Sequence, residues 1–85
     1  MEIGKNYFFR TDTDHWVGRL VSIDGPYTVT ITDFAYVADS GRLSEFLAKG
    51  RTGNMEIEAA PDGMNNKLNW RSVIDWPHPL LRETV

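Results

Sequence analysis

The chain has 85 residues, a formal net charge of −3 and no cysteine. The absence of cysteine excludes a disulfide framework, a thiolate zinc site and a cysteine nucleophile. The acidic balance disfavours general nucleic-acid binding, because neutralised phosphates supply most of that affinity. A hydrophobic share of 41% and an aromatic share of 12% are typical of a folded domain, so residues 1–85 are expected to form a single domain.

No segment predicts export or insertion into a membrane. Residues 1–6 lack the basic start and apolar run of a signal peptide. No apolar stretch approaches the roughly 20 residues that a membrane-spanning helix needs. The expected location is the cytoplasm.

Two strands are predicted first in the chain. Residues 6–11 are rich in aromatic side chains, and residues 15–23 place Val17, Val21 and Ile23 on one face, although a basic residue interrupts that face. The Asp-rich segment between the strands is typical of a turn.

A third strand is predicted at residues 27–32, after an Asp-Gly-Pro turn. Its side chains alternate with period two, which places Tyr27, Val29 and Ile31 inward and three threonines outward.

A short amphipathic helix is predicted from about residue 41 to 49. Leu43, Phe46 and Leu47 follow the i, i+3, i+4 spacing of one helical face, and Gly50 is suited to ending the helix.

Two more strands are predicted, at residues 55–59 and 69–76, with flexible loops at 50–54 and 61–66. The last strand would place one set of side chains on a single face: Trp70, Ser72, Ile74 and Trp76.

This order of three strands, one short helix and two strands (β-β-β-α-β-β) predicts a mainly β fold. In so short a chain, a bent sheet closing into a small SH3-like or Sm-like barrel is the first expectation. A single sheet covered by the one helix is the alternative.

The start of the predicted helix is the first candidate site. Gly41 and Arg42 stand there after Asp39 and Ser40, and the N–H groups of a helix start together with a guanidinium suit a phosphate or carboxylate. The alternative is an ordinary helix cap from Ser40 or Asp39, with Arg42 as a solvated surface charge.

Large aromatic rings are numerous for a domain of this size. Most are expected in the core, and the remainder would serve a subunit interface or stack on a flat ligand. Residues 76–85, which begin with the apolar, proline-rich segment 76–81, are interpreted as a docking tail, so a homo-oligomer is expected.

The sequence contains no pattern that predicts a catalytic site. Residues 12–15 combine two aspartates with a histidine, but a turn rich in Asp explains them better than a metal site does. Asp75 and His78 make an uncertain pair, and no nucleophile or phosphate-loop motif is present. No cofactor is implied.

The chain resembles a family of small, uncharacterised proteins of tailed phages and prophages. The resemblance spans nearly the whole chain and places the family's aromatic residue at Tyr36 and its usual threonine at Ser40. It is carried by ordered blocks at 16–21 (WVGRLV), 24–25 (DG), 38–42 (ADSGR) and 76–80 (WPHPL). It implies an accessory phage protein in the cytoplasm of the bacterial host, and no established activity.

By analogy with other small phage proteins, the expected role is to counter host defence by sequestering a nucleotide-type immune signal, such as a cyclic oligonucleotide or a cyclic ADP-ribose variant. The expected ligand-binding residues are Tyr36, Asp39, Ser40, Gly41, Arg42, Arg71, Trp76 and His78. In this hypothesis Arg42 binds a phosphate, Tyr36 or Trp76 stacks on a base, and a neighbouring subunit contributes Arg71 or His78.

Two other functions stay open. One is a protein-binding inhibitor that covers a host enzyme with an acidic or aromatic face. The other is a structural or assembly factor of the virion. An enzyme ranks last.

Overall fold

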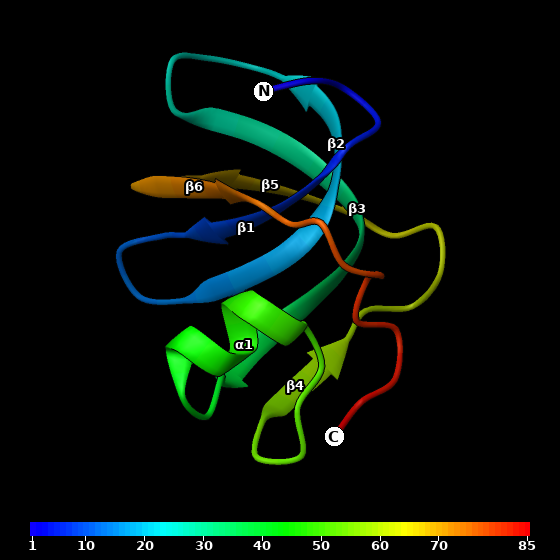
Figure 1. Cartoon of the computed structure of the whole chain (residues 1–85). Coiled ribbons are helices and arrows are strands. Elements are labelled where there is room, and N and C mark those ends of the chain that lie inside the picture. The colour runs from blue at the N-terminus through cyan, green and yellow to red at the C-terminus, as the bar shows by residue number, and fades with distance from the viewer.

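A computed structural model describes residues 1–85 and contains a six-stranded antiparallel sheet with one short helix (Figure 1). The elements in chain order are β1 (Asn6–Arg10), β2 (His15–Ile23), β3 (Thr28–Asp39), α1 (Leu43–Lys49), β4 (Glu56–Ala59), β5 (Asn65–Asn69) and β6 (Ser72–Asp75). The prediction of a mainly β fold with one short helix is confirmed. The last part of the chain holds one strand more than predicted, because β5 begins within the expected loop at 61–66.

The strands lie in the order β4-β3-β2-β1-β6, and β5 pairs with β3 beside this path. The long strand β3 therefore serves two neighbours: Thr28–Thr32 pairs with β5, and Ala35–Asp39 pairs with β4. The sheet is not closed into a barrel, since no pairing joins β5 to β6. The turn between β5 and β6 makes its backbone hydrogen bonds to other parts of the chain. Trp70 N–H donates to the Tyr27 carbonyl, and Arg71 N–H donates to the Arg10 carbonyl.

A bend in β3 divides the strand into these two parts. Asp33 has a φ of 47°, and the β2–β3 register shifts between Val17 and Arg19. Gly18 of β2 lies at this register shift, and a Cβ atom there would approach Ile31 Cδ1 to 2.9 Å. A larger residue at position 18 would have to displace the side chains of Ile31 and Phe34, which favours glycine there.

Register shifts also explain an error in the expected face of β2. Val17 is buried as predicted, but Val21 and Ile23 are 38% and 51% exposed, and Leu20 is buried instead. A second register shift between Leu20 and Ser22 changes which side chains point inward. Tyr27, also expected inward, lies before the first residue of β3 and is 63% exposed.

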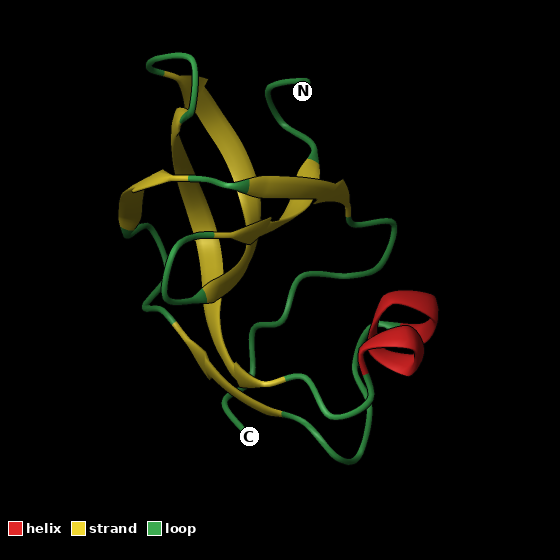
Figure 2. Cartoon of the chain, turned by 90° about the vertical axis from the view of Figure 1, so that its left-hand side faces the viewer, coloured by secondary structure: helices red, strands yellow, loops and turns green.

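Each face of the sheet carries its own hydrophobic core, because neighbouring residues of β1 point to opposite sides. The first cluster lies on the α1 side and consists of Phe8, Val17, Ala35, Val37, Phe46, Met55, Ile57, Trp76 and Leu81. The second cluster consists of Tyr7, Phe9, Leu20, Val29, Ile31, Phe34 and Leu68. Figure 2 shows α1 on one side of the strands.

The C-terminal segment 76–85 packs on its own chain, which corrects its interpretation as a docking tail. Trp76 and Leu81 are 3% and 2% exposed and complete the first cluster. Val85 exchanges two backbone hydrogen bonds with Ile57, at 2.9 and 3.0 Å. The two largest apolar contacts of the segment, Trp76 and Leu81, are thus made within the same chain, whereas Val85 stays 51% exposed.

Helix α1 holds the first cluster through Phe46, which is fully buried, whereas Leu43 is 52% exposed. The helix ends at Gly50, whose φ of 79° favours glycine and whose N–H donates to the Phe46 carbonyl at 2.8 Å. No helix in the structure has the length and apolar character needed to cross a membrane.

Candidate functional site

The segment Asp39–Arg42, predicted as an anion site, forms a tight turn. The Asp39 carboxylate accepts a hydrogen bond from Gly41 N–H at 2.8 Å. Gly41 has a φ of 68°, and a Cβ atom there would lie 2.6 Å from the Asn54 carbonyl oxygen. Arg42 is exposed at the N-cap of α1. Asp39 and Gly41 thus have a structural role in packing this turn against the loop before β4.

Replacing Gly41 by alanine is expected to lower the free energy of unfolding by about 2 kcal/mol, from the left-handed backbone and the contact with Asn54 together. Gly63→Ala is the matched control, because Gly63 has a φ of 80° and nothing within 4 Å of the new Cβ. The free energy of unfolding of the control is expected to fall by only about 1 kcal/mol, the cost of placing alanine in a left-handed backbone conformation. Urea denaturation measures both, and equal losses would contradict the packing role of Gly41.

The structure does not bring the other predicted ligand residues to this turn. Trp76 is buried, and its indole N–H donates to the Pro79 carbonyl at 3.1 Å, which leaves no ring face for a base. His78 Nε2 donates to the Leu47 carbonyl at 2.8 Å and so satisfies the C-terminal end of α1.

Arg71 forms a two-pronged ion pair with Asp12, with distances of 2.6 Å from Nε and 3.2 Å from a terminal nitrogen. The hydrogen bonds and the charge of Arg71 lower the pKa of the Asp12 carboxyl. This pair joins the β5–β6 turn to the β1–β2 turn. The Asp12 carboxylate is therefore already paired with a cationic side chain of the same protein.

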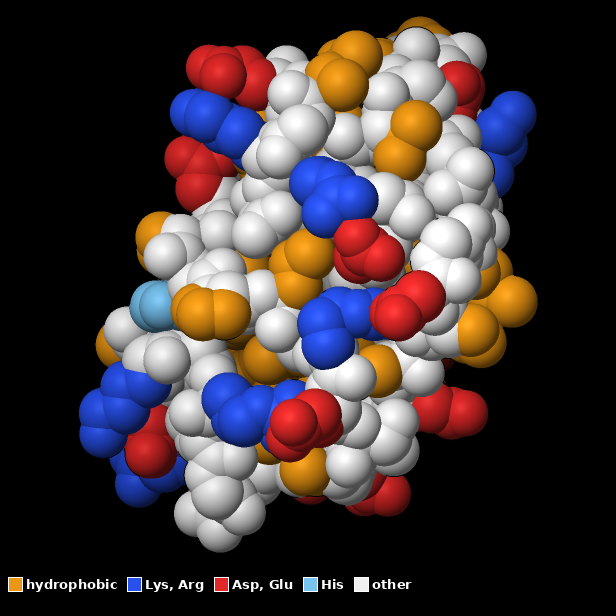
Figure 3. Space-filling model, turned by 90° about the vertical axis from the view of Figure 1, so that its right-hand side faces the viewer, with side chains coloured by type: hydrophobic (Ala, Val, Ile, Leu, Met, Phe, Trp, Pro, Cys, Tyr) orange, Lys and Arg blue, Asp and Glu red, His pale blue; other side chains and the backbone are white.

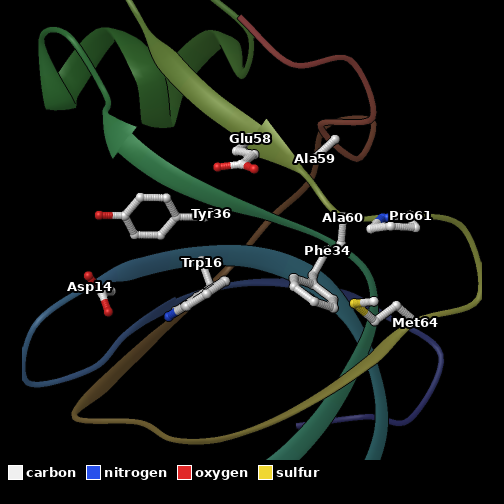
Figure 4. A pocket seen from close by; sticks show the side chains of 9 residues that line it. All are labelled: Asp14, Trp16, Phe34, Tyr36, Glu58, Ala59, Ala60, Pro61 and Met64. Atoms are coloured by element: carbon white, nitrogen blue, oxygen red, sulfur yellow. The ribbon is translucent and has the colours of Figure 1, made fainter.

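Tyr36 is the one predicted residue that lines the largest pocket of the protein. This acidic-aromatic pocket has a volume of about 460 Å³. Its lining residues are Asp14, Trp16, Phe34, Tyr36, Glu58, Ala59, Ala60, Pro61 and Met64. Figure 4 shows the Tyr36 hydroxyl, Asp14 and Glu58 toward one end, and Phe34, Met64 and Pro61 toward the other.

Strand register builds the polar end of the pocket. Trp16 of β2 stands directly opposite Tyr36 of β3, and Tyr36 stands opposite Glu58 of β4. Directly opposed side chains share one face of a sheet. The ring centroids of Trp16 and Tyr36 are 5.2 Å apart, so the two rings form a continuous aromatic wall beside the Glu58 carboxylate.

The electrostatics of this pocket favour positive charge. Asp14 and Glu58 contribute carboxylates, and no basic side chain is among the lining residues. The charge of Asp14, followed by partial burial, raises the pKa of the Tyr36 hydroxyl, so the phenol stays neutral. Carboxylates beside tryptophan and tyrosine rings are the groups that bind ammonium and guanidinium ions.

Arg82 supports the floor of the pocket from the C-terminal segment. Its guanidinium donates to the carbonyls of Phe34 and Ala60, at 2.8 and 2.6 Å, and contacts Asp62 at 2.9 Å. Phe34 and Ala60 both line the pocket, so the C-terminal segment fixes the backbone on which it is built.

Elsewhere the surface charges are mixed. Figure 3 shows one face on which most basic side chains lie beside acidic ones, an arrangement unlike the continuous basic patch that binds nucleic acid. No group of three His, Cys, Asp or Glu side chains is placed to hold a metal ion. The turn at residues 12–15 instead directs Asp12 toward Arg71 and Asp14 toward the pocket.

Comparison with known proteins finds no matching family model, no matching curated protein and no matching solved structure. The resemblance to small phage proteins therefore stays a prediction from the sequence.

Proposed function

We propose that this chain is a protein-binding module that takes a lysine or arginine side chain of a partner protein into the acidic-aromatic pocket. The observation that carries the proposal is the row of Trp16, Tyr36 and Glu58 across three neighbouring strands, with Asp14 beside it. It agrees with the possibility, raised by the acidic composition, of an inhibitor that binds a host protein through an acidic or aromatic face.

The two ends of the pocket match the two parts of a basic side chain. The aliphatic stem of a lysine or arginine packs on apolar surface while its charged head stays near acceptors. Here Phe34 and Met64 offer the apolar surface, and Asp14 and Glu58 offer the acceptors. The volume of about 460 Å³ also leaves room for an apolar neighbour of the basic residue.

Binding of short peptides tests this proposal. An apolar peptide with one central arginine, and the same peptide with lysine, are expected to shift the NMR signals of Trp16 and Tyr36. The peptide with glutamine at the central position is the matched control and is expected to cause no shift. If arginine and glutamine peptides bind equally, the charge recognition proposed here is wrong.

Glu58→Gln combined with Asp14→Asn is expected to weaken binding of the arginine peptide by about tenfold or more, through loss of two charge-assisted contacts. Glu56→Gln is the control for Glu58, because it removes the same charge from the same strand outside this pocket. Titration of the folded variants measures the effect, and an equal loss in the control would indicate only a long-range charge effect.

The role expected from the phage resemblance, sequestration of a nucleotide-type immune signal, is the second proposal. One observation favours it: Ser40 lines a separate hollow together with a histidine and an arginine. Thermal unfolding with cyclic oligonucleotides and cyclic ADP-ribose isomers tests it, since a ligand at about 100 times its dissociation constant stabilises a fold by roughly 2.7 kcal/mol. From the sequence we also propose a homo-oligomer, a role in the virion, and a relation to small SH3-like or Sm-like barrels.

A further inference from the structure

A second hollow, of about 200 Å³, opens on the face of the sheet opposite the acidic-aromatic pocket. The two sites share β2, where His15 lines the hollow and the next residue, Trp16, lines the pocket. Consecutive residues of a strand point to opposite faces. We call the hollow the Arg10 hollow, after the one charged side chain among its lining residues.

Three strands place the polar groups of the Arg10 hollow side by side. Arg10 of β1 stands directly opposite His15 of β2 on one side and Ser72 of β6 on the other. Opposed side chains of this kind have Cβ atoms about 4.5–5.5 Å apart, so a guanidinium, an imidazole and a hydroxyl reach one small ligand group. The connection between β3 and α1 adds the hydroxyl of Ser40.

Arg10 differs from the other arginines in and beside the sheet. Arg19 of β2 pairs with Asp33 at 2.7 Å, and Arg71 of the β5–β6 turn pairs with Asp12. Arg10 is exposed and belongs to none of the ion pairs of the protein. The chain has a net charge of −3, yet Arg10 has no acidic partner within it. A guanidinium surrounded by hydroxyl and imidazole groups is suited to binding an anionic ligand.

Apolar side chains border these donors. Leu43 and Ile74 line the hollow and are 52% and 48% exposed. Phe8 forms its inner side and contacts the His15 ring edge to face, with centroids 5.5 Å apart, which fixes the imidazole beside Arg10. A ligand that fills the hollow therefore has an anionic group and a flat or apolar body.

We infer that the Arg10 hollow binds a phosphate monoester with an aromatic body, such as a nucleotide. Arg10 and His15 bind the phosphate with the hydroxyls of Ser40 and Ser72, and the ring covers Leu43 and Ile74. This site keeps Ser40 from the set expected from the sequence and replaces Arg42 by Arg10. The inference rests on side chains of neighbouring strands and is independent of the proposed binding of a basic side chain.

Adenosine monophosphate, inorganic phosphate and adenosine are the probes, each titrated into the full chain and followed by amide NMR shifts. Adenosine monophosphate is expected to shift the signals of Arg10, His15 and Ser72 and to bind more tightly than phosphate or adenosine alone. Arg10→Gln is expected to weaken its binding by about tenfold or more. Arg42→Gln is the matched control. Arg42 is also an exposed arginine and follows Ser40 by two residues, but it does not line the hollow. This variant is expected to bind adenosine monophosphate as the unaltered protein does.

The outcomes separate the possible sites. Loss of binding in Arg42→Gln with retention in Arg10→Gln would overturn the inference and return the ligand to the start of α1. Absence of shifts with all three probes would also overturn it. A normal arginine-peptide titration of the same Arg10→Gln sample shows that the fold is intact and that the proposed function stands or fails separately.

Discussion

Replacing Trp76 by alanine is expected to lower the free energy of unfolding by about 3–5 kcal/mol, the usual range for removing a buried aromatic side chain. Trp76 is 3% exposed and packs against both Phe8 and Phe46, with ring centroids 6.3 and 4.8 Å away. A domain of this size has little stability to lose. Thermal and urea unfolding are therefore expected to show that Trp76→Ala is largely unfolded under conditions in which the unaltered protein is folded.

Tyr27→Ala is the control for this experiment. Tyr27 is an aromatic residue that the alternating pattern predicted inward, but it is 63% exposed beside Trp70. Its replacement is expected to cost less than about 1 kcal/mol. The outcome that would contradict the structure is a Trp76→Ala protein of unchanged stability and altered oligomeric state in sedimentation, because that result would make Trp76 an interface residue.

The sequence predicts the elements of this fold better than it predicts their faces. Period-two alternation located Val29 and Ile31 correctly, because a regular strand turns each second side chain inward. It failed in β2, where two register shifts move Leu20 to the core and Val21 to the surface. Such shifts depend on the partner strand, so no pattern within β2 itself reveals them.

The site was harder to predict than the fold. Tyr36 was singled out from the sequence, but its neighbours Trp16 and Glu58 come from other strands and meet it only through the β2–β3–β4 register. The turn at Asp39–Arg42 had the composition of an anion site, yet the φ of Gly41 and its contact with Asn54 explain the glycine structurally. A local pattern identifies a turn, whereas a binding site requires knowledge of what the fold places opposite it.

The C-terminal segment shows the same limit. Its prolines and apolar residues predicted a free arm, because nothing in residues 76–85 indicates which surface they cover. In the structure the end of the segment lies beside β4, where Val85 exchanges backbone hydrogen bonds with Ile57. The segment also brings Arg82 to the Phe34 carbonyl, next to the bend of β3. The segment therefore links the first core cluster to the floor of the acidic-aromatic pocket.

Arg82→Ala is expected to lower the free energy of unfolding by about 3 kcal/mol, since hydrogen bonds from a charged donor contribute about 1.5–3 kcal/mol each. The Arg82 side chain is only 27% exposed, and its fork donates to the Phe34 and Ala60 carbonyls at once. The third contact, to Asp62, adds little because that carboxylate is 98% exposed. Urea denaturation measures the loss.

Arg51→Ala is the matched control, because Arg51 also holds the C-terminal segment, through the Glu83 carbonyl at 2.7 Å, but from an exposed position. Its replacement is expected to cost less than about 0.5 kcal/mol. Arg82→Lys separates charge from geometry: an ammonium group is a point charge and does not reproduce the fork that spans two carbonyls. A lysine variant as stable as the unaltered protein would show that charge alone matters at this position. We expect Arg82→Lys to lose less free energy of unfolding than Arg82→Ala but more than Arg51→Ala. We also expect it to bind the arginine peptide more weakly, because the carbonyls that Arg82 holds belong to residues that line the pocket.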